Sequence, residues 1–283
     1  MPTLLSCTDG SVYSKSIYDH TAWAARRLGA AVQVLHMLEY PASPPPADAS
    51  GTIGFDAQST LLEELVAVAE SQGRLAQQRG RAVLAEARRH LAEAGVSDVV
   101  AEQQHGGLVD ALERLEAAVE LIVIGKRGEH ADFAKLHLGS NLERVLRSSR
   151  RPVLVASRAF QPIERFLVAY DGSPSLLKAL DYVQRSPLLR GLPCHLVQAG
   201  KIDDNARYYL GEAVGRLRDA GFEVTSEATS GAPAEVIAAA ATAQQTGLIV
   251  MGAYGHSRVR QFFVGSTTSE IVRGVLLPVL LFR

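Results

Sequence analysis

Short apolar segments alternate along the chain with longer segments in which apolar residues recur every three or four positions. A short apolar run bounded by turn residues is typical of a strand buried on both faces, whereas the longer spacing predicts a helix with one buried side. The alternation favours a parallel sheet with helices on both faces, so we predict an α/β fold. The predicted strands are residues 3–8, 31–38, 99–103, 121–124, 152–156, 166–170, 194–199, 223–228, 248–251 and 278–282.

The second half of the chain repeats the pattern of the first half. The tripeptide Asp-Gly-Ser follows the first predicted strand at residues 9–11 and recurs after the sixth at residues 171–173. The segment LIVIGKRG at residues 121–128 likewise matches LIVMGAYG at residues 248–255. Such self-similarity is the sequence signature of a repeated structural unit.

The length of the chain agrees with two repeated units. At 283 residues it exceeds the roughly 150 residues of a typical α/β domain. We therefore predict one domain at residues 1–157 and a second at residues 162–283. The first domain carries a Pro-rich insertion at residues 41–60, predicted as a surface excursion, and then a long helix from about residue 61 to residue 94.

Three glycines near the C-terminus carry the candidate chemistry of the second half. Gly252 and Gly255 follow a buried strand, and Gly265 comes one loop later, directly before three hydroxyl residues at 266–268. Ligands of open parallel sheets bind beyond the carboxyl ends of the strands, where the strand order reverses. Glycine lets a ligand approach the backbone closely, and a helix N-terminus offers unpaired N–H groups that suit a phosphate. The pattern therefore predicts a phosphate-binding edge.

A carboxylate and a second strand end complete this edge. Asp171 closes the first strand of the second half, where a carboxylate can accept hydrogen bonds from a ribose or hold a metal ion through water. The backbone near Ala199, after the next strand, is in a position to meet a base. Each feature alone also has a purely structural interpretation, because glycines mark turns and Asp-Gly-Ser caps helices. Their combination in one half is the stronger signal.

With these motifs the sequence resembles the universal stress protein family in its tandem form, over both halves and nearly end to end. The family pattern is Gly, two residues, Gly, nine residues, Gly and then Ser or Thr, which the second half matches without a slip. The resemblance implies two five-stranded open sheets of order 3-2-1-4-5, with ATP or ADP as the ligand and Mg²⁺ as a candidate partner. The nucleotide-binding residues it implies are Ala169, Tyr170, Asp171, Ala199, Met251, Gly252, Gly255, Gly265, Ser266, Thr267 and Thr268.

The first half departs from this pattern. Gly125 and Gly128 are present, but ten residues rather than nine separate Gly128 from Gly139. Residues 141–143, Asn-Leu-Glu, replace the hydroxyl residues, and two acidic residues enter the loop at 129–138. Like-charge repulsion and the shifted register both argue against a triphosphate here. We predict that this half is either a structural partner or the holder of a different ligand.

Three functions remain open. The chain is compatible with a nucleotide-binding regulatory protein that signals to an unidentified protein partner, with a slow ATPase or another adenine-nucleotide enzyme, and with a structural, chaperone-like protein. Adenylylating enzymes of this fold are expected to carry a paired-histidine motif or a Ser-Gly-Gly-x-Asp-Ser loop, and here the sequences are TDGS and YDGS. No residue is clearly a general base, and the eight histidines lack metal-ligand spacing. We favour binding, predict no catalytic residue and leave metal ligands unassigned.

Composition and charge indicate which partners and which cellular compartment to expect. The net charge of −1 gives no bulk signal for nucleic acid or for an anionic membrane. The two cysteines, Cys7 and Cys194, sit in unlike contexts and fit a reducing compartment. The N-terminus lacks a signal-peptide pattern, and the apolar runs fall short of the roughly 20 residues of a membrane span. We expect a cytoplasmic protein that binds neither nucleic acid nor a membrane.

The last predicted strand of each half is apolar and follows a proline, Pro152 or Pro278. The family resemblance makes these strands the fifth and outermost of their sheets. An exposed apolar edge recruits other chains, and neither strand carries a lysine to prevent this. We predict that the two strands pair antiparallel, which makes the chain a pseudo-dimer by itself, with a homodimer through the Pro-rich insertion as a further option.

Overall fold

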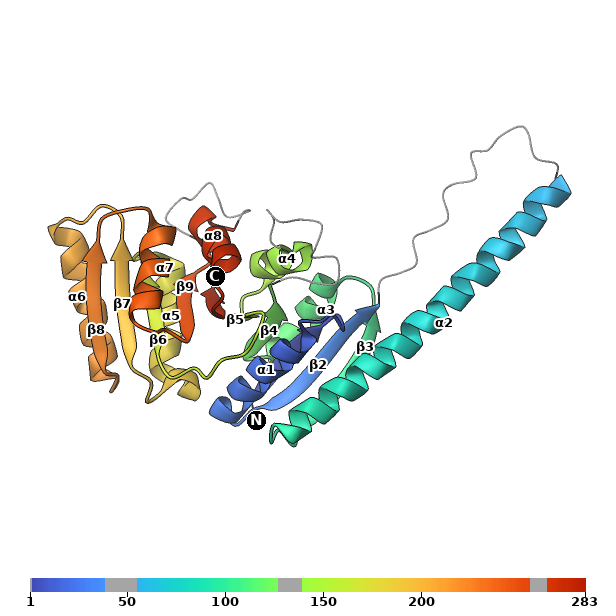
Figure 1. Cartoon of the computed structure of the whole chain (residues 1–283), viewed down its shortest axis with the longest axis horizontal. Helices are drawn as coiled ribbons and strands as arrows, with labels where there is room; N and C mark the ends of the chain where they lie inside the picture. Colours follow the sequence, from blue (N-terminus) through green and yellow to red (C-terminus); the bar gives the residue numbers. More distant parts are fainter. Residues whose placement is uncertain (1, 39–54, 127–138, 255–263) are drawn as a thin grey trace.

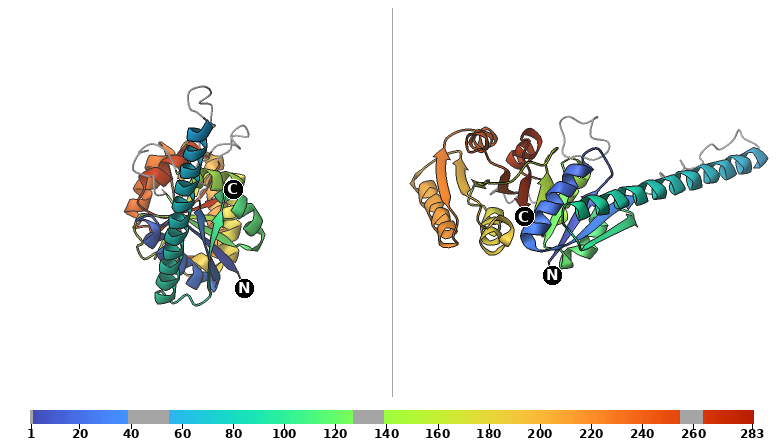
Figure 2. Two further views of the ribbon diagram at one scale, coloured as in Figure 1. Left: turned by 90° about the vertical axis from the view of Figure 1, so that its right-hand side faces the viewer. Right: turned by 60° about the horizontal axis from the view of Figure 1, so that its bottom comes forward.

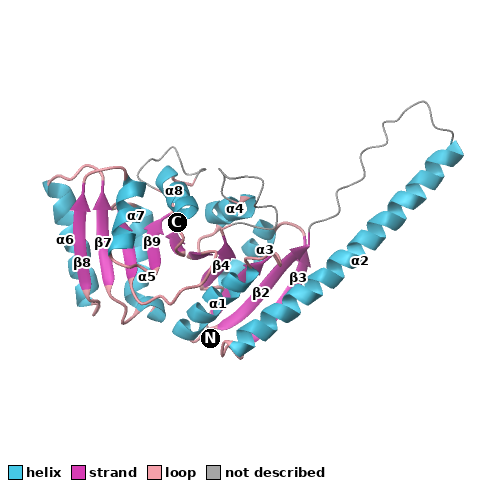
Figure 3. Ribbon diagram, viewed as in Figure 1, coloured by secondary structure: helices cyan, strands magenta, loops and turns pink. Residues whose placement is uncertain are grey.

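The computed structural model describes residues 2–38, 55–126, 139–254 and 264–283, and helices alternate with strands throughout (Figure 3). The elements of the first half are β1 (Thr3–Thr8), α1 (Ser14–Leu28), β2 (Ala31–Leu38), α2 (Phe55–Glu93), β3 (Val99–His105), α3 (Leu108–Leu115), η1 (Glu116–Ala118), β4 (Leu121–Gly125), α4 (Ser140–Ser148) and β5 (Val153–Ala156). Those of the second half are β6 (Phe166–Tyr170), α5 (Pro174–Arg185), η3 (Pro187–Leu189), β7 (Cys194–Ala199), α6 (Asp204–Asp219), β8 (Val224–Thr229), α7 (Pro233–Ala243), β9 (Leu248–Gly252), α8 (Ser266–Gly274) and β10 (Val279–Phe282).

The ten strands of the described residues form one continuous sheet in the order β3-β2-β1-β4-β5-β10-β9-β6-β7-β8 (Figure 1). Within each half the strands run parallel in the order 3-2-1-4-5, which confirms the predicted order. The two predicted five-stranded sheets are therefore the halves of a single sheet.

Strands β5 and β10 join the two halves, and we call this pair of strands the seam. They pair antiparallel, with Val155 opposite Val279 and Leu154 opposite Leu280. All four side chains are buried. The predicted pairing of the two apolar end strands is thus found within one chain, whereas association of two whole chains stays a prediction.

Helices cover both faces of the sheet (Figure 2). Neighbouring residues of a strand point to opposite faces, so that Leu4 belongs to one apolar cluster and Leu5 to the other. Helices α1, α2, α5 and α6 contribute to the first cluster, and helices α3, α4, α7 and α8 to the second. Burial on both faces explains why the strands appear in the sequence as unbroken apolar runs.

Helix α2 is longer than the sequence predicted. It begins at Phe55 rather than near residue 61, so residues 55–60 are helical. Residues 55–60 show no apolar periodicity in the sequence, so the prediction started the helix too late. Only its C-terminal part packs on the sheet, through the buried side chains of Leu84, Ala87 and Leu91. The rest projects beyond the sheet (Figure 1), with Leu75 62% exposed.

The two halves repeat one another down to individual side-chain contacts. In the first half His90 at the end of α2 lies 2.6 Å from the carboxylate of Asp19 on α1. In the second half Arg216 of α6 lies 2.6 Å from the carboxylate of Asp181 on α5. Asp19 and Asp181 stand at the same distance from the Asp-Gly-Ser motif of their halves. The repeat therefore preserves how the first two helices of each half contact one another.

The seam is expected to control the stability of the whole chain. Leu280→Lys places an ammonium group in the middle of the buried seam and should lower the free energy of unfolding by more than about 3 kcal/mol. The matched control is Val100→Lys, on edge strand β3, where the native side chain is 50% exposed and the cost should stay within about 0.5 kcal/mol. Denaturant unfolding of the full chain measures both changes, and equal losses would contradict a controlling role for the seam.

Candidate functional site

The predicted site residues of the second half gather at one edge of the sheet. Strand β6 lies between β7 and β9, so the chain leaves β6 toward one side and returns on the other. This is the point where the strand order reverses, and there the carboxyl ends of β6 and β9 separate and leave room for a ligand. Asp171 follows β6, and Gly265 precedes α8 at the same edge.

Asp171 is held by the turn that follows β6. Its Oδ1 accepts a hydrogen bond from the backbone N–H of Ser173 at 2.9 Å, and Gly172 between them adopts a φ of +69°. That left-handed conformation favours glycine. Ser173 then caps helix α5 by accepting a hydrogen bond from the backbone N–H of Leu176 at 3.3 Å. The Asp-Gly-Ser motif therefore forms a tight turn that fixes an exposed carboxylate at the edge.

Gly252 ends strand β9 and has a packing role that the sequence did not reveal. A Cβ atom at this position would collide with Oγ of Ser175 and would lie 3.2 Å from Oγ of Ser173. The hydroxyl of Ser175 in turn donates a hydrogen bond to the carbonyl of Tyr254 at 2.7 Å. The absence of a side chain at Gly252 therefore lets the start of α5 lie directly against the end of β9.

The N-terminus of helix α8 is tied to the same strand end. The backbone N–H of Gly265 donates to the carbonyl of Ala253 at 3.0 Å, and the hydroxyl of Thr268 donates to the carbonyl of Gly252 at 3.1 Å. Thr268 is buried, whereas Ser266 is exposed. Gly265 is the N-cap and has no side chain with which to cap the helix. The first turn of α8 is thus fixed in position without a side-chain cap.

The remaining predicted residues differ in where they lie. Ala169 and Met251 are buried in the second apolar cluster beneath the edge, and Tyr170 points to the opposite face. Ala199 is half-buried at the end of β7. Gly255 lies outside the described residues. The structure therefore brings together Asp171, Ala199, Gly252, Gly265, Ser266, Thr267 and Thr268 at the edge, with Ala169 and Met251 below them.

Gln198 is a residue at this edge that the sequence analysis did not single out. It pairs in register with Tyr170 and directly precedes Ala199. Its amide oxygen is buried and has no hydrogen-bond partner among the described residues. Its counterpart in the first half is His36, whose Nδ1 lies 3.0 Å from the carbonyl of Thr8. As the register partner of Tyr170, Gln198 points to the same face of the sheet as Tyr170, away from Ala169 and Met251.

The corresponding edge of the first half is covered by helix α2. A Cβ atom on Gly10, in the turn after β1, would collide with the side chain of Val83, and one on Gly80 would lie 2.9 Å from the ring of His36. In α6 of the second half, Tyr209 occupies the position of Val83 when the helix ends are aligned, and it is 58% exposed. Helix α2 therefore lies over an edge that α6 leaves accessible.

The motif of the first half shows its departures where the structure describes it. Gly125 ends β4, and Gly139 is the N-cap of α4. Leu142 is buried at the position where Thr268 stands in the second half, so it cannot form the hydroxyl link to the strand. Gly128 and the acidic residues Glu129 and Asp132 lie outside the described residues.

Reactive side chains are scarce in the described part of the chain. Burial raises the pKa of the Cys7 thiol to about 12 and also raises that of Cys194 well above its usual range, so both stay protonated. Burial lowers the pKa of His20 to about 4 and keeps its ring neutral. No group of three or more His, Cys, Asp or Glu side chains within residues 2–38, 55–126, 139–254 and 264–283 is arranged to hold a metal ion. Among these residues no helix is both long and apolar enough to cross a membrane.

The fold and the position of the edge define an open, doubly wound α/β protein with a candidate ligand site at the reversal of strand order. The model of the universal stress protein family matches residues 1–157 and 162–283. The chain therefore belongs to the universal stress protein family and contains two consecutive copies of its unit, which confirms the resemblance inferred from the motifs.

Individual relatives agree with this assignment. The chain is 39% identical to "Universal stress protein Slr1230" of Synechocystis sp. over 287 residues, which cover all of both chains. Among solved structures, a universal stress protein from Archaeoglobus fulgidus superimposes with a TM-score of 0.71 at 23% identity, covering 99% of this chain and 96% of that chain. A putative universal stress protein from Pseudomonas aeruginosa gives a TM-score of 0.61 at 14% identity, covering 100% and 93%. At these identities the two structures support the fold alone.

The packing role of Gly252 leads to a prediction about stability. Gly252→Ala should lower the free energy of unfolding by about 1–3 kcal/mol because the new methyl group overlaps the hydroxyl of Ser175. Ser175→Ala removes that oxygen, so the double variant should lose at least about 0.5 kcal/mol less than the sum of the single variants. Gly274→Ala is the control, since no atom lies within 4 Å of its added methyl group. Additive losses in denaturant unfolding would contradict the assigned contact.

Proposed function

We propose that the second half of this universal stress protein binds ATP or ADP in the cytoplasm, and that its occupancy regulates an unidentified protein partner in a stress response. The observation that carries the proposal is the N-terminus of α8, which is anchored to the end of β9 without a side-chain cap. It stands at the edge where the Asp171 carboxylate also lies. Phosphate and ribose are the two groups that these features suit.

The phosphates are expected at the start of α8. The first N–H groups of a helix lack backbone partners and carry a partial positive charge. Gly265 leaves them accessible, and the hydroxyls of Ser266 and Thr267 stand in the first turn. The buried hydroxyl of Thr268 instead holds the helix against Gly252. Thr268 therefore contributes by fixing the position of the phosphate site.

The nucleoside is expected between the ends of β6 and β7. The Asp171 carboxylate is exposed there and is suited to accept hydrogen bonds from ribose hydroxyls. The backbone at Ala199 faces the base.

A magnesium ion would have to be held mainly by the nucleotide. The described residues offer no cluster of side chains for it, and Mg²⁺ commonly binds through phosphates, waters and one or two carboxylates. Asp171 is the described carboxylate at this edge and the natural candidate for a contact through water. The ion would then enter together with ATP.

The first half is proposed to act as a structural partner with no nucleotide of its own. The contacts of Val83 with Gly10 and of Gly80 with His36 support this, since they place α2 over the equivalent edge. The substitution of Leu142 for Thr268 removes the hydroxyl link there. We therefore expect about one nucleotide per chain.

Equivalent glycines in the two halves provide a controlled test of nucleotide binding. Gly265 and Gly139 cap α8 and α4 with nearly the same backbone angles, φ −55° with ψ 144° and φ −56° with ψ 134°. Gly265→Val should weaken ATP binding at least tenfold in titration calorimetry, because its side chain blocks the approach of phosphate to the backbone. Gly139→Val carries a similar cost at its helix start and should bind ATP like the parent. Equal affinity in both variants would place the site elsewhere.

Catalysis provides a separate test. The purified protein with ATP and Mg²⁺ should turn over far more slowly than the ordinary enzyme range of about 1–1000 per second. Phosphate release is the measurement, with Asp9→Ala as the first-half counterpart of Asp171→Ala. A rate within the ordinary range that Asp171→Ala abolishes and Asp9→Ala preserves would identify the second half as an ATPase.

A further inference from the structure

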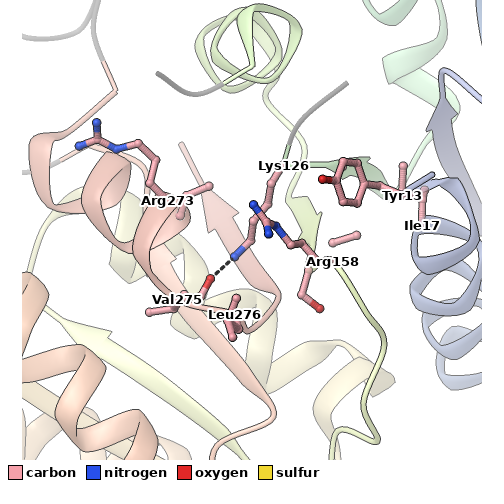
Figure 4. Close-up of a pocket in the computed structure, with 11 residues that line it drawn as sticks. Tyr13, Ile17, Lys126, Arg158, Arg273, Val275 and Leu276 are labelled. Atoms are coloured by element: carbon pink, nitrogen blue, oxygen red, sulfur yellow. Dashed lines mark hydrogen bonds between the residues drawn. The ribbon is translucent and has the colours of Figure 1, made fainter. Parts of the chain in front are cut away.

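A cavity of about 170 Å³ lies beside the seam, between the two halves (Figure 4). The first half contributes the start of α1, the ends of β4 and β5 and the residues that follow them. The second half contributes the end of α8 and the turn after it. Its lining includes Tyr13, Ile17, Lys126, Arg158, Val272 and Leu276.

This cavity is separate from the proposed nucleotide site. Its second-half residues come from the C-terminal end of α8, whereas the phosphates are expected at the N-terminal end of that helix. Neither Asp171 nor Ala199 lines it. The volume is close to that of an engineered apolar cavity of about 150 Å³ that holds benzene, so it accommodates one ring and is too small for a nucleotide.

Three cationic residues line the cavity, and the side chains of two of them, Lys126 and Arg158, converge on it, whereas that of Arg273 is directed away (Figure 4). The ammonium group of Lys126 donates a hydrogen bond to the carbonyl of Val275 at 2.6 Å. Arg158, the second residue after β5, extends toward Lys126 (Figure 4). Its guanidinium carbon lies 6.0 Å from the centre of the Tyr13 ring. Among the described lining residues there is no aspartate or glutamate. Among the described residues that line the cavity, positive charge is therefore concentrated without a lining carboxylate to balance it.

The position of Lys126 is costly for a charged group. Burial, and to a smaller extent the nearby charge of Arg158, lower the pKa of its ammonium group to about 8. An ammonium group has three N–H donors, and one of them serves Val275. An anion between the two cations would remove the repulsion and accept the remaining donors.

The other wall of the cavity is apolar. Ile17 and Val272 are buried, and Leu276 lies at the rim with 77% of its surface exposed. An exposed leucine beside a cavity can cover part of a bound apolar group. A ligand that suits both walls carries one negative charge and a compact hydrocarbon body.

We propose that this cavity binds a small aromatic or branched organic carboxylate. The carboxylate lies between Lys126 and Arg158, and the hydrocarbon body lies against Ile17, Val272 and Leu276. Because residues of both halves form the site, an occupied cavity links the end of α8 to the first half.

The described residues at the equivalent position of the second half differ. Ala253 stands at the position of Lys126 and is buried. The C-terminal end of α4 is instead met by Arg283, which donates to the carbonyls of Arg147 and Ser148, and by the hydroxyl of Tyr254, which donates to the carbonyl of Leu146 at 3.1 Å. One carboxylate per chain is therefore expected.

The test uses the full chain with 4-fluorobenzoate, observed by fluorine NMR titration. Saturable binding at one site per chain is expected, and the neutral 4-fluorobenzamide should bind at least tenfold more weakly. Lys126→Met should weaken 4-fluorobenzoate binding at least tenfold, while Lys201→Met, which removes an exposed lysine of the second half, should leave it unchanged. Saturating ATP should not displace the probe.

Other outcomes would overturn the proposal. The first is the absence of 4-fluorobenzoate binding at millimolar probe in excess over protein, and the second is equal binding of the amide. The others are displacement of the probe by ATP, and binding of phenyl phosphate without binding of 4-fluorobenzoate. If Lys126→Met does not fold, Arg158→Gln takes its place in the test. The native Arg158 side chain is exposed, so its loss should not disturb packing. It should weaken binding at least threefold, and unchanged binding would exclude the assigned site.

Discussion

The antiparallel pairing of β5 and β10 is the contact on which the rest of the architecture depends. Either strand alone would leave an apolar edge with unpaired backbone groups, and together they bury both. The pairing also brings the last helix of each half against the other half. Lys126 reaches the end of α8, and Arg283 reaches the end of α4. Cations at these helix ends meet carbonyls that have no partner within their helices, so one pairing of strands produces two further contacts across the seam.

The two halves share one plan and differ most through a single helix. Helices α2 and α6 connect equivalent strands and use the same face to pack, and in both a side chain contacts the carboxylate of an aspartate on the first helix. Helix α2 has 39 residues and α6 has 16. In the first half this places Val83 and Gly80 against the strand edge. A change in the length and course of a connecting helix is therefore enough to make one edge accessible and the other covered, without any change in the sheet.

The strands were predictable because a strand that is buried on both faces consists of consecutive apolar residues. The bounds of β1, β2, β6 and β7 match the prediction, and the order of strands followed from the family resemblance. The start of α2 was missed because residues 55–60 show no apolar periodicity in the sequence. The contact of Gly252 with Ser175 and the unpaired amide of Gln198 depend on how distant elements pack. The cavity at the seam combines four separate segments, which no local spacing records.

The position of β10 has a consequence for synthesis of the chain. Of the ten described strands it comes last along the chain, yet it lies at the middle of the sheet. Strand β5 ends at Ala156 and β10 ends at Phe282, so the first half leaves the ribosome well before its partner strand exists. At about 5–20 residues per second this interval lasts roughly 6–25 s. During that time the apolar edge of β5 lacks the strand that covers it in the complete sheet.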